Sequence, residues 1–372
     1  MARLPDADAV LATVRAIGRT PTAPYHERRV LSAIRSVLAG DGIGLRDDDY
    51  GQLLATVRRG RARRPLALVA HTDHPAFEVV SAYGREGIAR VLGGFRGRVL
   101  EAAAGVLVHD DDAARAPQRA TIDRFVPDLD PVHNSPGRVR IRSEGDLVVG
   151  QWATLDLPAC DLDGDELHMV AADDLAGCAI VAHALRELAQ DDVPVDVTAV
   201  FTRAEETGLY GARIVAEGDA IPRDAIVVSV EASRALPHAA PGDGIVVRTG
   251  DLHNTFSNEA ERFLRAAAER LRRDGIRTQR ALLDGGTCEA STFVVHGWDT
   301  TAIALPNVNY HDRGPDERFA TEVVRLSDIR CGVALLVETA RAVAEDAREA
   351  WWATAGPVPE DVRDALRDEG RS

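Results

Sequence analysis

Apolar residues recur along the chain in two patterns, short continuous runs and longer segments with helical spacing. Residues 7–40 carry apolar positions three and four apart, which predicts two helices separated by a glycine- and proline-containing break at 18–24. Continuous apolar runs at 53–57 and 66–70 predict two strands. The chain therefore begins with two helices and then enters a sheet.

The pattern changes between residues 78 and 163, where short β-like pieces alternate with many glycines and with an acidic turn at 109–112. No long amphipathic helix is evident in this segment. We expect residues 78–163 to form an inserted small β domain that resembles a barrel and serves as a lid or an association surface.

Beyond Asp173 helical and strand patterns alternate again. Helices are predicted at 175–188, 209–217, 258–273, 288–295 and 323–344, and strands at 195–201, 225–230, 245–248, 278–282 and 301–305. This alternation predicts an α/β fold with a mixed, largely parallel sheet between helices, built from residues 1–77 and 164–350. The tail, 351–372, is polar apart from two tryptophans, and we assign it no chemistry.

Composition narrows the functional classes. With 372 residues the chain exceeds the usual size of one core, and its net charge of −15 argues against nucleic acid as a partner. It contains no lysine, which excludes lysine chemistry such as a Schiff base. Four well-separated cysteines indicate neither a disulfide framework nor a thiolate metal site. No apolar run approaches the ~20 residues that span a bilayer, so we expect a cytoplasmic protein without membrane contact.

Two adjacent carboxylates, Glu205 and Glu206, follow the strand predicted at 195–201 and precede a glycine-broken turn into a helix. The carboxyl ends of the strands in an α/β sheet are where active sites form. One carboxylate could hold a metal while its neighbour moves a proton. A merely solvated acidic turn is less favoured, because two charges at the end of an apolar strand are poorly placed unless they are paired or bind metal.

Metal-ligand residue types follow other predicted strands in the same way. They are His71 and Asp73 after 66–70, Asp173, Glu231 after 225–230, and His311 after 301–305. His71 can offer a ring nitrogen while Asp73 orients a neighbouring group. Asp173 is the candidate for a carboxylate shared by two metals. Its neighbour Asp174 can be explained as a helix N-cap.

Several other residues have simpler explanations. An isolated His-x-Asp recurs often by chance, and only its position at a strand end favours function. His74 is ambiguous because it lies three residues from His71. Gly93 and Gly94 could suggest a phosphate loop, but they neither follow a clear strand nor open a helix, so we discard that interpretation.

Together, the motifs HTDHPAFEV, VAADDLAG, AEETGLYGA, the strand ending in Glu231, and GGTCEAS followed by ALPNVNYHD resemble the co-catalytic di-zinc aminopeptidases. The most similar branch is that of the glutamyl, deblocking and tetrahedral aminopeptidases, in the clan that also contains dizinc carboxypeptidases and deacylases. The resemblance spans about residues 7–345. In that branch a small β domain is inserted between the His-x-Asp motif and the shared aspartate, as residues 78–163 are here.

The resemblance implies a ligand set. His71 and Glu231 would each bind a single metal, Asp173 would bridge the two, Glu206 and His311 would complete the site, and Glu205 would be the general base. The branch usually has aspartate where Glu231 stands, Glu-Ile-Gly where this chain has 74–76, and GGTD where it has GGTCE. The last two departures are expected to flank the substrate side.

The sequence thus predicts a hydrolase with two divalent metal ions, zinc in first place and cobalt or manganese as alternatives. The expected reaction is aminopeptidase cleavage of N-terminal residues from peptides. An amidohydrolase or deacylase acting on a small N-acyl or amino-acid conjugate, and a non-catalytic binding protein on the same scaffold, are the alternatives. The resemblance also implies a homo-oligomer.

Overall fold

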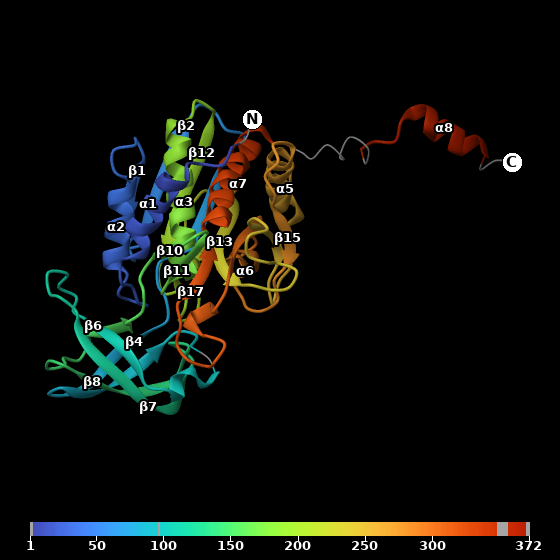
Figure 1. Ribbon diagram of the computed structural model, residues 1–372. Helices are drawn as coiled ribbons and strands as arrows, with labels where there is room; N and C mark the ends of the chain where they lie inside the picture. Colours follow the sequence, from blue (N-terminus) through green and yellow to red (C-terminus); the bar gives the residue numbers. More distant parts are fainter. Residues whose placement is uncertain (1–2, 96, 348–355, 370–372) are drawn as a thin grey trace.

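The computed structural model describes residues 3–95, 97–347 and 356–369 (Figure 1). A mixed sheet forms its centre, with the strand order β1-β2-β12-β3-β13-β16-β14-β15. These strands are β1 (Gly44–Asp47), β2 (Leu53–Arg59), β3 (Leu66–His71), β12 (Val195–Thr202), β13 (Ile226–Arg234), β14 (Val246–Gly250), β15 (Gln279–Leu282) and β16 (Thr300–Asn307). We call this sheet and its helices the main body.

The middle of the sheet is parallel. Strands β12, β3, β13 and β16 are neighbours in that order and run in the same direction, so their carboxyl ends meet at one edge. Their apolar runs are buried on both faces, as expected for parallel strands. In β3, Leu68 packs into the core on one face and Val69 into the core on the other. Strand β1 was not among the predicted elements.

Helices cover both faces of the sheet (Figure 1). The larger layer contains α1 (Ala7–Gly18), α2 (Arg28–Leu38), α3 (Ala172–Gln190), α5 (Asn258–Arg273) and α7 (Leu326–Glu345). The opposite layer contains α4 (Tyr210–Glu217) and α6 (Glu289–Val295), which pack on the sheet through residues such as Val215 and Phe293. Two of these helices begin at a side-chain N-cap: Asp6 caps α1 and Ser257 caps α5.

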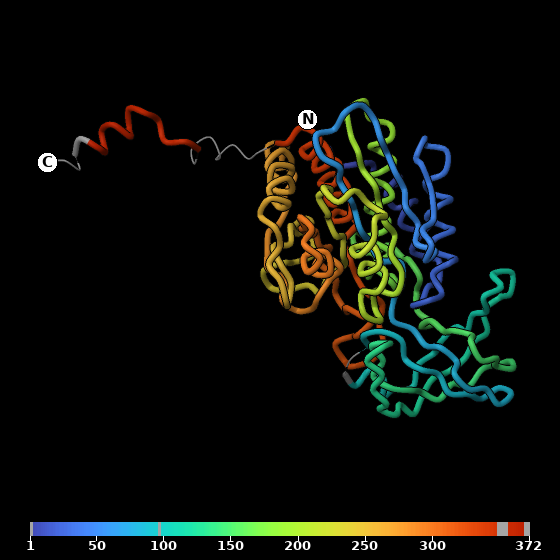
Figure 2. Tube along the Cα trace, turned by 180° about the vertical axis from the view of Figure 1, so that it is seen from behind, coloured from blue at the N-terminus to red at the C-terminus, as the bar shows by residue number. Residues whose placement is uncertain are grey.

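A closed barrel of strands follows β3 in the chain and lies at one end of the main body (Figures 1 and 2). Its strands are β4 (Ala76–Tyr83), β5 (Glu86–Leu92), β6 (Ala104–His109), β7 (Gln118–Asp130), β8 (Ser135–Ser143) and β9 (Trp152–Leu155), with a short 3-10 turn, η1 (Gly97–Glu101), between β5 and β6. Its core includes Phe77 and Phe95, whose rings stack at 5.4 Å. The predicted fold class, a mixed sheet between helices with an inserted barrel, is confirmed.

A small antiparallel sheet, in the order β10-β11-β17, corrects two predictions. It consists of β10 (Asp161–Asp163), β11 (Glu166–Met169) and β17 (Glu322–Arg325). The helix predicted at 323–344 begins only at Leu326, because residues 322–325 pair with β11 instead of joining the helix. The strand ahead of Asp173 is β11, which belongs to this small sheet and not to the main one.

The last described segment is helix α8 (Glu360–Glu369), which lies away from the main body in both views (Figures 1 and 2). Trp351 and Trp352, the tryptophans of the predicted tail, fall outside the described residues. Among the helices that the structure describes, each is too short or too polar to cross a lipid bilayer.

Candidate metal centre

The parallel strands deliver polar side chains to one edge of the sheet. His71 is the last residue of β3, Glu205 and Glu206 follow β12, Glu231 lies in β13, and His311 lies in the 3-10 turn η2 (Tyr310–Asp312) after β16. Because β12, β3, β13 and β16 are adjacent, these side chains meet although they are up to 240 residues apart (311 − 71). Asp173 joins them from the start of α3 and not from a strand end.

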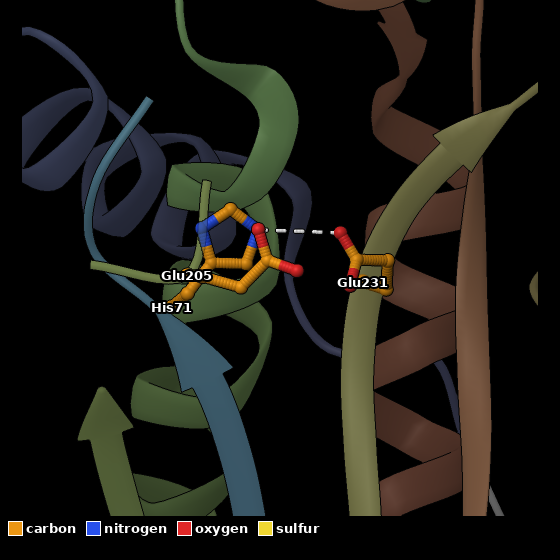
Figure 3. Close-up of side chains that lie close together, drawn as sticks. All are labelled: His71, Glu205 and Glu231. Atoms are coloured by element: carbon orange, nitrogen blue, oxygen red, sulfur yellow. Dashed lines mark hydrogen bonds and ion pairs between the residues drawn. The ribbon is translucent and has the colours of Figure 1, made fainter. Parts of the chain in front are cut away.

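One group of potential ligands consists of His71, Glu205 and Glu231, whose donor atoms lie within 4.8 Å of one another. Figure 3 shows the three side chains pointing toward one another, with a dashed line from the imidazole of His71 to the carboxylate of Glu231. That contact joins Nε2 to Oε1 at 3.2 Å, and the same nitrogen lies 3.2 Å from Oδ1 of Asp173.

A second group consists of Asp173, Glu206 and His311, within the same 4.8 Å limit. Nε2 of His311 lies 3.4 Å from Oδ2 of Asp173 and 3.4 Å from Oε1 of Glu206. Asp173 therefore directs one oxygen toward His71 and the other toward His311. A carboxylate in this position can be shared between two cations.

The charge of the cluster requires compensation. Asp173, Glu205, Glu206 and Glu231 carry four negative charges when ionised, and the two imidazoles are neutral as ligands. Buried charge is costly unless it is paired or bound to metal. Three of the cluster's buried atoms, Oε1 of Glu206, Oε2 of Glu231 and Nε2 of His311, have no hydrogen-bond partner among the described residues. Imidazole and carboxylate are common ligands of zinc, so the residues fit two divalent cations, whose combined charge would balance four carboxylates.

Burial and neighbouring charges shift the pKa values of the residues in this cluster. Burial would lower the pKa of His71, but the carboxylates of Glu205 and Glu231 raise it well above its ordinary value. Burial raises the pKa of Glu205 well above its usual range, although His71 opposes this shift. Burial also raises the pKa of Glu231, and the charge of Asp173 adds to the effect. Without a cation the cluster therefore favours protonated carboxyls.

The Glu205-Glu206 loop is held by two other carboxylates. The two oxygens of Asp73 accept the backbone N–H groups of Glu205 at 2.9 Å and Glu206 at 3.0 Å. Glu27, from the start of α2, accepts the N–H of Ala204 at 3.0 Å. The fully buried carboxylate of Asp73 thus positions Glu205 and Glu206 by binding their backbone N–H groups.

Glu322 holds two of the candidate ligands together. Its carboxylate accepts the backbone N–H of Asp173 at 2.9 Å and that of His311 at 2.8 Å, and the amide of Asn307 donates to it at 2.8 Å. His311 has φ +57°, a left-handed conformation that is uncommon without glycine and that these contacts maintain. Sequence reasoning missed Glu322, because its role depends on β17 pairing beside the site.

His74, whose role was ambiguous from the sequence, contacts the backbone of Asp173 and the side chain of Asp312. Its Nδ1 lies 2.5 Å from the carbonyl oxygen of Asp173 and its Nε2 lies 2.8 Å from Oδ2 of Asp312. Burial would lower the pKa of His74, but Glu322 and Asp312 raise it to about 9, so both nitrogens can donate. Asp174 accepts the N–H of Gly177 at 3.1 Å, in the manner of a helix cap.

The barrel contributes to the site through two glycines and an asparagine. Gly93 follows β5, and a Cβ at this position would lie 3.0 Å from the Cβ of Glu206. The carbonyl of Gly94 lies 3.0 Å from Nδ1 of His311. The side-chain amide of Asn134 donates to the carbonyl of Glu206 at 2.8 Å. The sequence interpretation that these glycines do not follow a strand was therefore wrong. Their small size permits the backbone to approach the candidate ligands closely.

A pocket of about 370 Å³ opens beside the cluster and is lined by Glu205, Glu206, Tyr310 and His311 among others. Residues 285–287, the GGT of GGTCE, also line it, whereas Cys288 and Glu289 are buried and do not. Glu289 instead accepts a hydrogen bond from Thr202. The expectation that the departures at 74–76 and in GGTCE flank the substrate side is therefore wrong for His74 and Glu289, which support the site from within.

Two comparisons at the level of sequence bear on this site. Residues 143–325 match the family described as M42 glutamyl aminopeptidase. A curated protein of Acetivibrio thermocellus, with a provisional aminopeptidase name, is 30% identical over 184 residues, which cover 48% of this chain and 52% of that protein. The matched region thus spans about half the length of this relative.

Solved structures with the same fold cover most of the chain. An aminopeptidase from the archaeon Desulfurococcus kamchatkensis aligns with a TM-score of 0.74 and 21% identity, over 95% of this chain and 99% of that one. The TET1 peptidase of Pyrococcus horikoshii, which can assemble into a tetrahedron or a large octahedral shell, aligns with a TM-score of 0.73 and 19% identity, over 89% and 99%. At these identities the likeness concerns the fold.

Proposed function

We propose that this chain, whose residues 143–325 match the M42 glutamyl aminopeptidase family, is a metal-dependent aminopeptidase. This family match supports the resemblance to the co-catalytic di-zinc aminopeptidases that the motifs indicate. The observation that carries the proposal is the position of Asp173, whose two carboxylate oxygens face His71 on one side and His311 on the other.

In this proposal His71 and Glu231 hold one cation, Glu206 and His311 hold the other, and Asp173 is shared. Two divalent cations, zinc in first place, would polarise the scissile carbonyl and stabilise the negative charge that develops on its oxygen. Glu205 is partly exposed in the pocket, where its carboxylate can reach a substrate. We assign Glu205 as the general base that takes a proton from the attacking water and returns it to the leaving amine.

The carboxylates of Glu205 and Glu206, which line the pocket, favour a substrate with a free α-amine. We therefore expect the metal-loaded protein to hydrolyse dipeptides and aminoacyl amides with a free N-terminus and to leave the same compounds intact when they are N-acetylated. A hydrolysis assay on matched free and N-acetylated pairs tests this. Faster hydrolysis of the N-acetylated member would indicate a deacylase, and hydrolysis of neither would indicate a binding protein.

Arg234 supplies a candidate for side-chain recognition. It lies near the end of β13, three residues after Glu231, lines the pocket, and stacks over the ring of Tyr310 at 5.6 Å. Within the described part of the chain it makes no ion pair, whereas Arg313, which also lines the pocket, is bound to Glu317. We propose that Arg234 binds the carboxylate of an acidic N-terminal residue, in keeping with the family description.

The expected result for Arg234→Ala is a fall of about tenfold or more in kcat/KM for glutamyl p-nitroanilide relative to leucyl p-nitroanilide, the loss of one charge-assisted contact. Arg313→Ala is the matched control and should leave the ratio unchanged, because Glu317 already occupies its guanidinium. A ratio that stays constant in Arg234→Ala would refute this assignment.

We further propose that the chain forms a homo-oligomer through the barrel. The hairpin of β7 and β8 exposes three apolar side chains, Val126, Leu129 and Val132, of which Leu129 is 80% exposed. Adjacent exposed apolar groups of this kind mark contact surfaces. We also place the protein in the cytoplasm, where its four free, buried cysteines would stay reduced.

Light scattering should therefore report a mass well above 40.0 kDa for the wild type and a smaller mass for Leu129→Asp. Val295→Asp is the control, because Val295 is 74% exposed at the end of α6, far from the hairpin in the chain. A strict monomer at micromolar concentration would contradict the association. An effect of both substitutions alike would show that the hairpin is not the contact.

A further inference from the structure

A second cavity, of about 460 Å³, lies between the barrel and the main body and is separate from the pocket beside the metal cluster. The barrel forms one wall with β6 and β9, and the loop between α1 and α2 forms another. Its inner end includes His74, which contacts Asp173. Its volume falls within the range of about 300–1,000 Å³ that is typical of small-molecule sites.

The lining of this cavity is largely apolar. Leu107, Leu155, Leu157 and Val170 line it, together with several alanines and prolines. Apolar walls with a few polar groups are the usual composition of a small-molecule site. A ligand that fits this cavity should therefore present an apolar part to these walls.

The charged residues that line the cavity are all cationic. Arg19, Arg29 and Arg115 line it, and its lining contains no aspartate or glutamate, although the chain has a net charge of −15. Arg115 is paired with Asp110. Within the described residues, neither Arg19 nor Arg29 pairs with a carboxylate; Arg29 donates instead to the backbone carbonyl of Asp110 at 2.5 Å. Two guanidinium charges are thus available to an anion.

A buried histidine in the same lining has an unused nitrogen. His109 is 3% exposed and its Nε2 lies 3.0 Å from the hydroxyl of Thr154, whereas its Nδ1 has no hydrogen-bond partner in the part of the chain that the structure describes. Burial, with the nearby charge of Arg29, lowers the pKa of His109 to about 4, so the ring is neutral near pH 7. A buried polar atom without a partner is uncommon unless a ligand or water completes it.

We propose that this cavity binds a small carboxylate with an apolar body, its carboxylate toward Arg19 and its apolar part between Leu107, Leu155 and Val170. Both a simple carboxylic acid and a free apolar amino acid have this chemistry. They differ in the ammonium group, which the unpartnered Nδ1 of His109 could accept. The site does not depend on the proposed peptidase activity, because it uses none of the metal-cluster residues as ligands.

Isothermal titration of the full-length protein with hexanoate, norleucine and 1-hexanol tests the proposal. Hexanoate or norleucine should bind saturably at one site per chain, and 1-hexanol, with a similar apolar chain and no charge, at least about tenfold more weakly. Arg19→Ala should weaken carboxylate binding by about the same factor. Arg19 is exposed, so this variant should fold normally.

Two further variants localise the site. Ala159→Trp, at a lining residue, should reduce binding by filling the cavity, whereas Arg85→Ala, at an exposed arginine that does not line it, should have no effect. Tighter binding of norleucine would identify an apolar amino acid, and tighter binding of hexanoate a simple acid; either supports the site. Absence of saturable binding, equal binding of 1-hexanol, or insensitivity to both Arg19→Ala and Ala159→Trp would overturn it.

Discussion

Glu205→Gln is expected to lower turnover by about 10²- to 10⁴-fold, the usual contribution of a general base. Glutamine keeps the size and hydrogen-bonding capacity of the side chain but cannot accept the proton. Because Asp73 holds residue 205 through its backbone N–H, the loop should keep its conformation. Metal content and melting temperature should therefore stay close to those of the wild type, and rate assays with elemental analysis measure both effects.

Glu206→Gln is the matched comparison, because Glu206 is the adjacent carboxylate in the same loop and faces His311 at 3.4 Å. It should weaken metal binding, whereas Glu205→Gln should not. The assignment of base and ligand would be reversed if Glu205→Gln lost metal while Glu206→Gln kept it. Near-wild-type turnover of Glu205→Gln would exclude it as the base.

Asp173→Asn should have the larger effect on the metals. Asp173 faces both His71 and His311, so losing its charge removes the shared ligand of both cations. Altering even an outer partner of a metal site costs about 10- to 100-fold in affinity, so a shared ligand should cost more than about 100-fold. We expect metal content well below that of the wild type after dialysis, together with loss of hydrolysis.

The neighbouring residue provides the control. Asp174 is also a buried aspartate, but its carboxylate accepts the N–H of Gly177 at the start of α3. Asparagine caps a helix about as well as aspartate, so Asp174→Asn should cost less than about 1 kcal/mol of stability and should retain the metals. Equal metal loss in the two variants would show that Asp173 has no special role.

The sequence predicts most of the fold because its elements carry local signals. The apolar run at 66–70 and the helical spacing at 258–273 each correspond to one element, β3 and α5. The predicted start of the closing helix was wrong because Val323 and Val324, which are β-branched and favour a strand, pair with β11. That pairing is a contact between residues more than 150 positions apart, which local patterns do not contain.

In the site, too, some residues carry a local sequence signal and others are placed only by long-range contacts. His71, Glu205, Glu206 and His311 end or follow parallel strands, and Glu231 lies in the second half of one, so the expectation that ligands gather at the carboxyl ends of strands finds them from the sequence. Glu322, Gly94 and Asn134 have no such signal. Their contributions come from the packing of β17 and the barrel against the cluster, through contacts with Asp173, His311 and Glu206.

Metal stoichiometry of the wild-type chain tests the central claim most directly. The protein would be reconstituted with zinc or cobalt, dialysed to remove loosely bound ions, and measured by elemental analysis. The two groups of potential ligands, with Asp173 facing both His71 and His311, predict a value approaching two metals per chain. A value near zero after reconstitution would contradict the two-metal site and the reaction proposed for it.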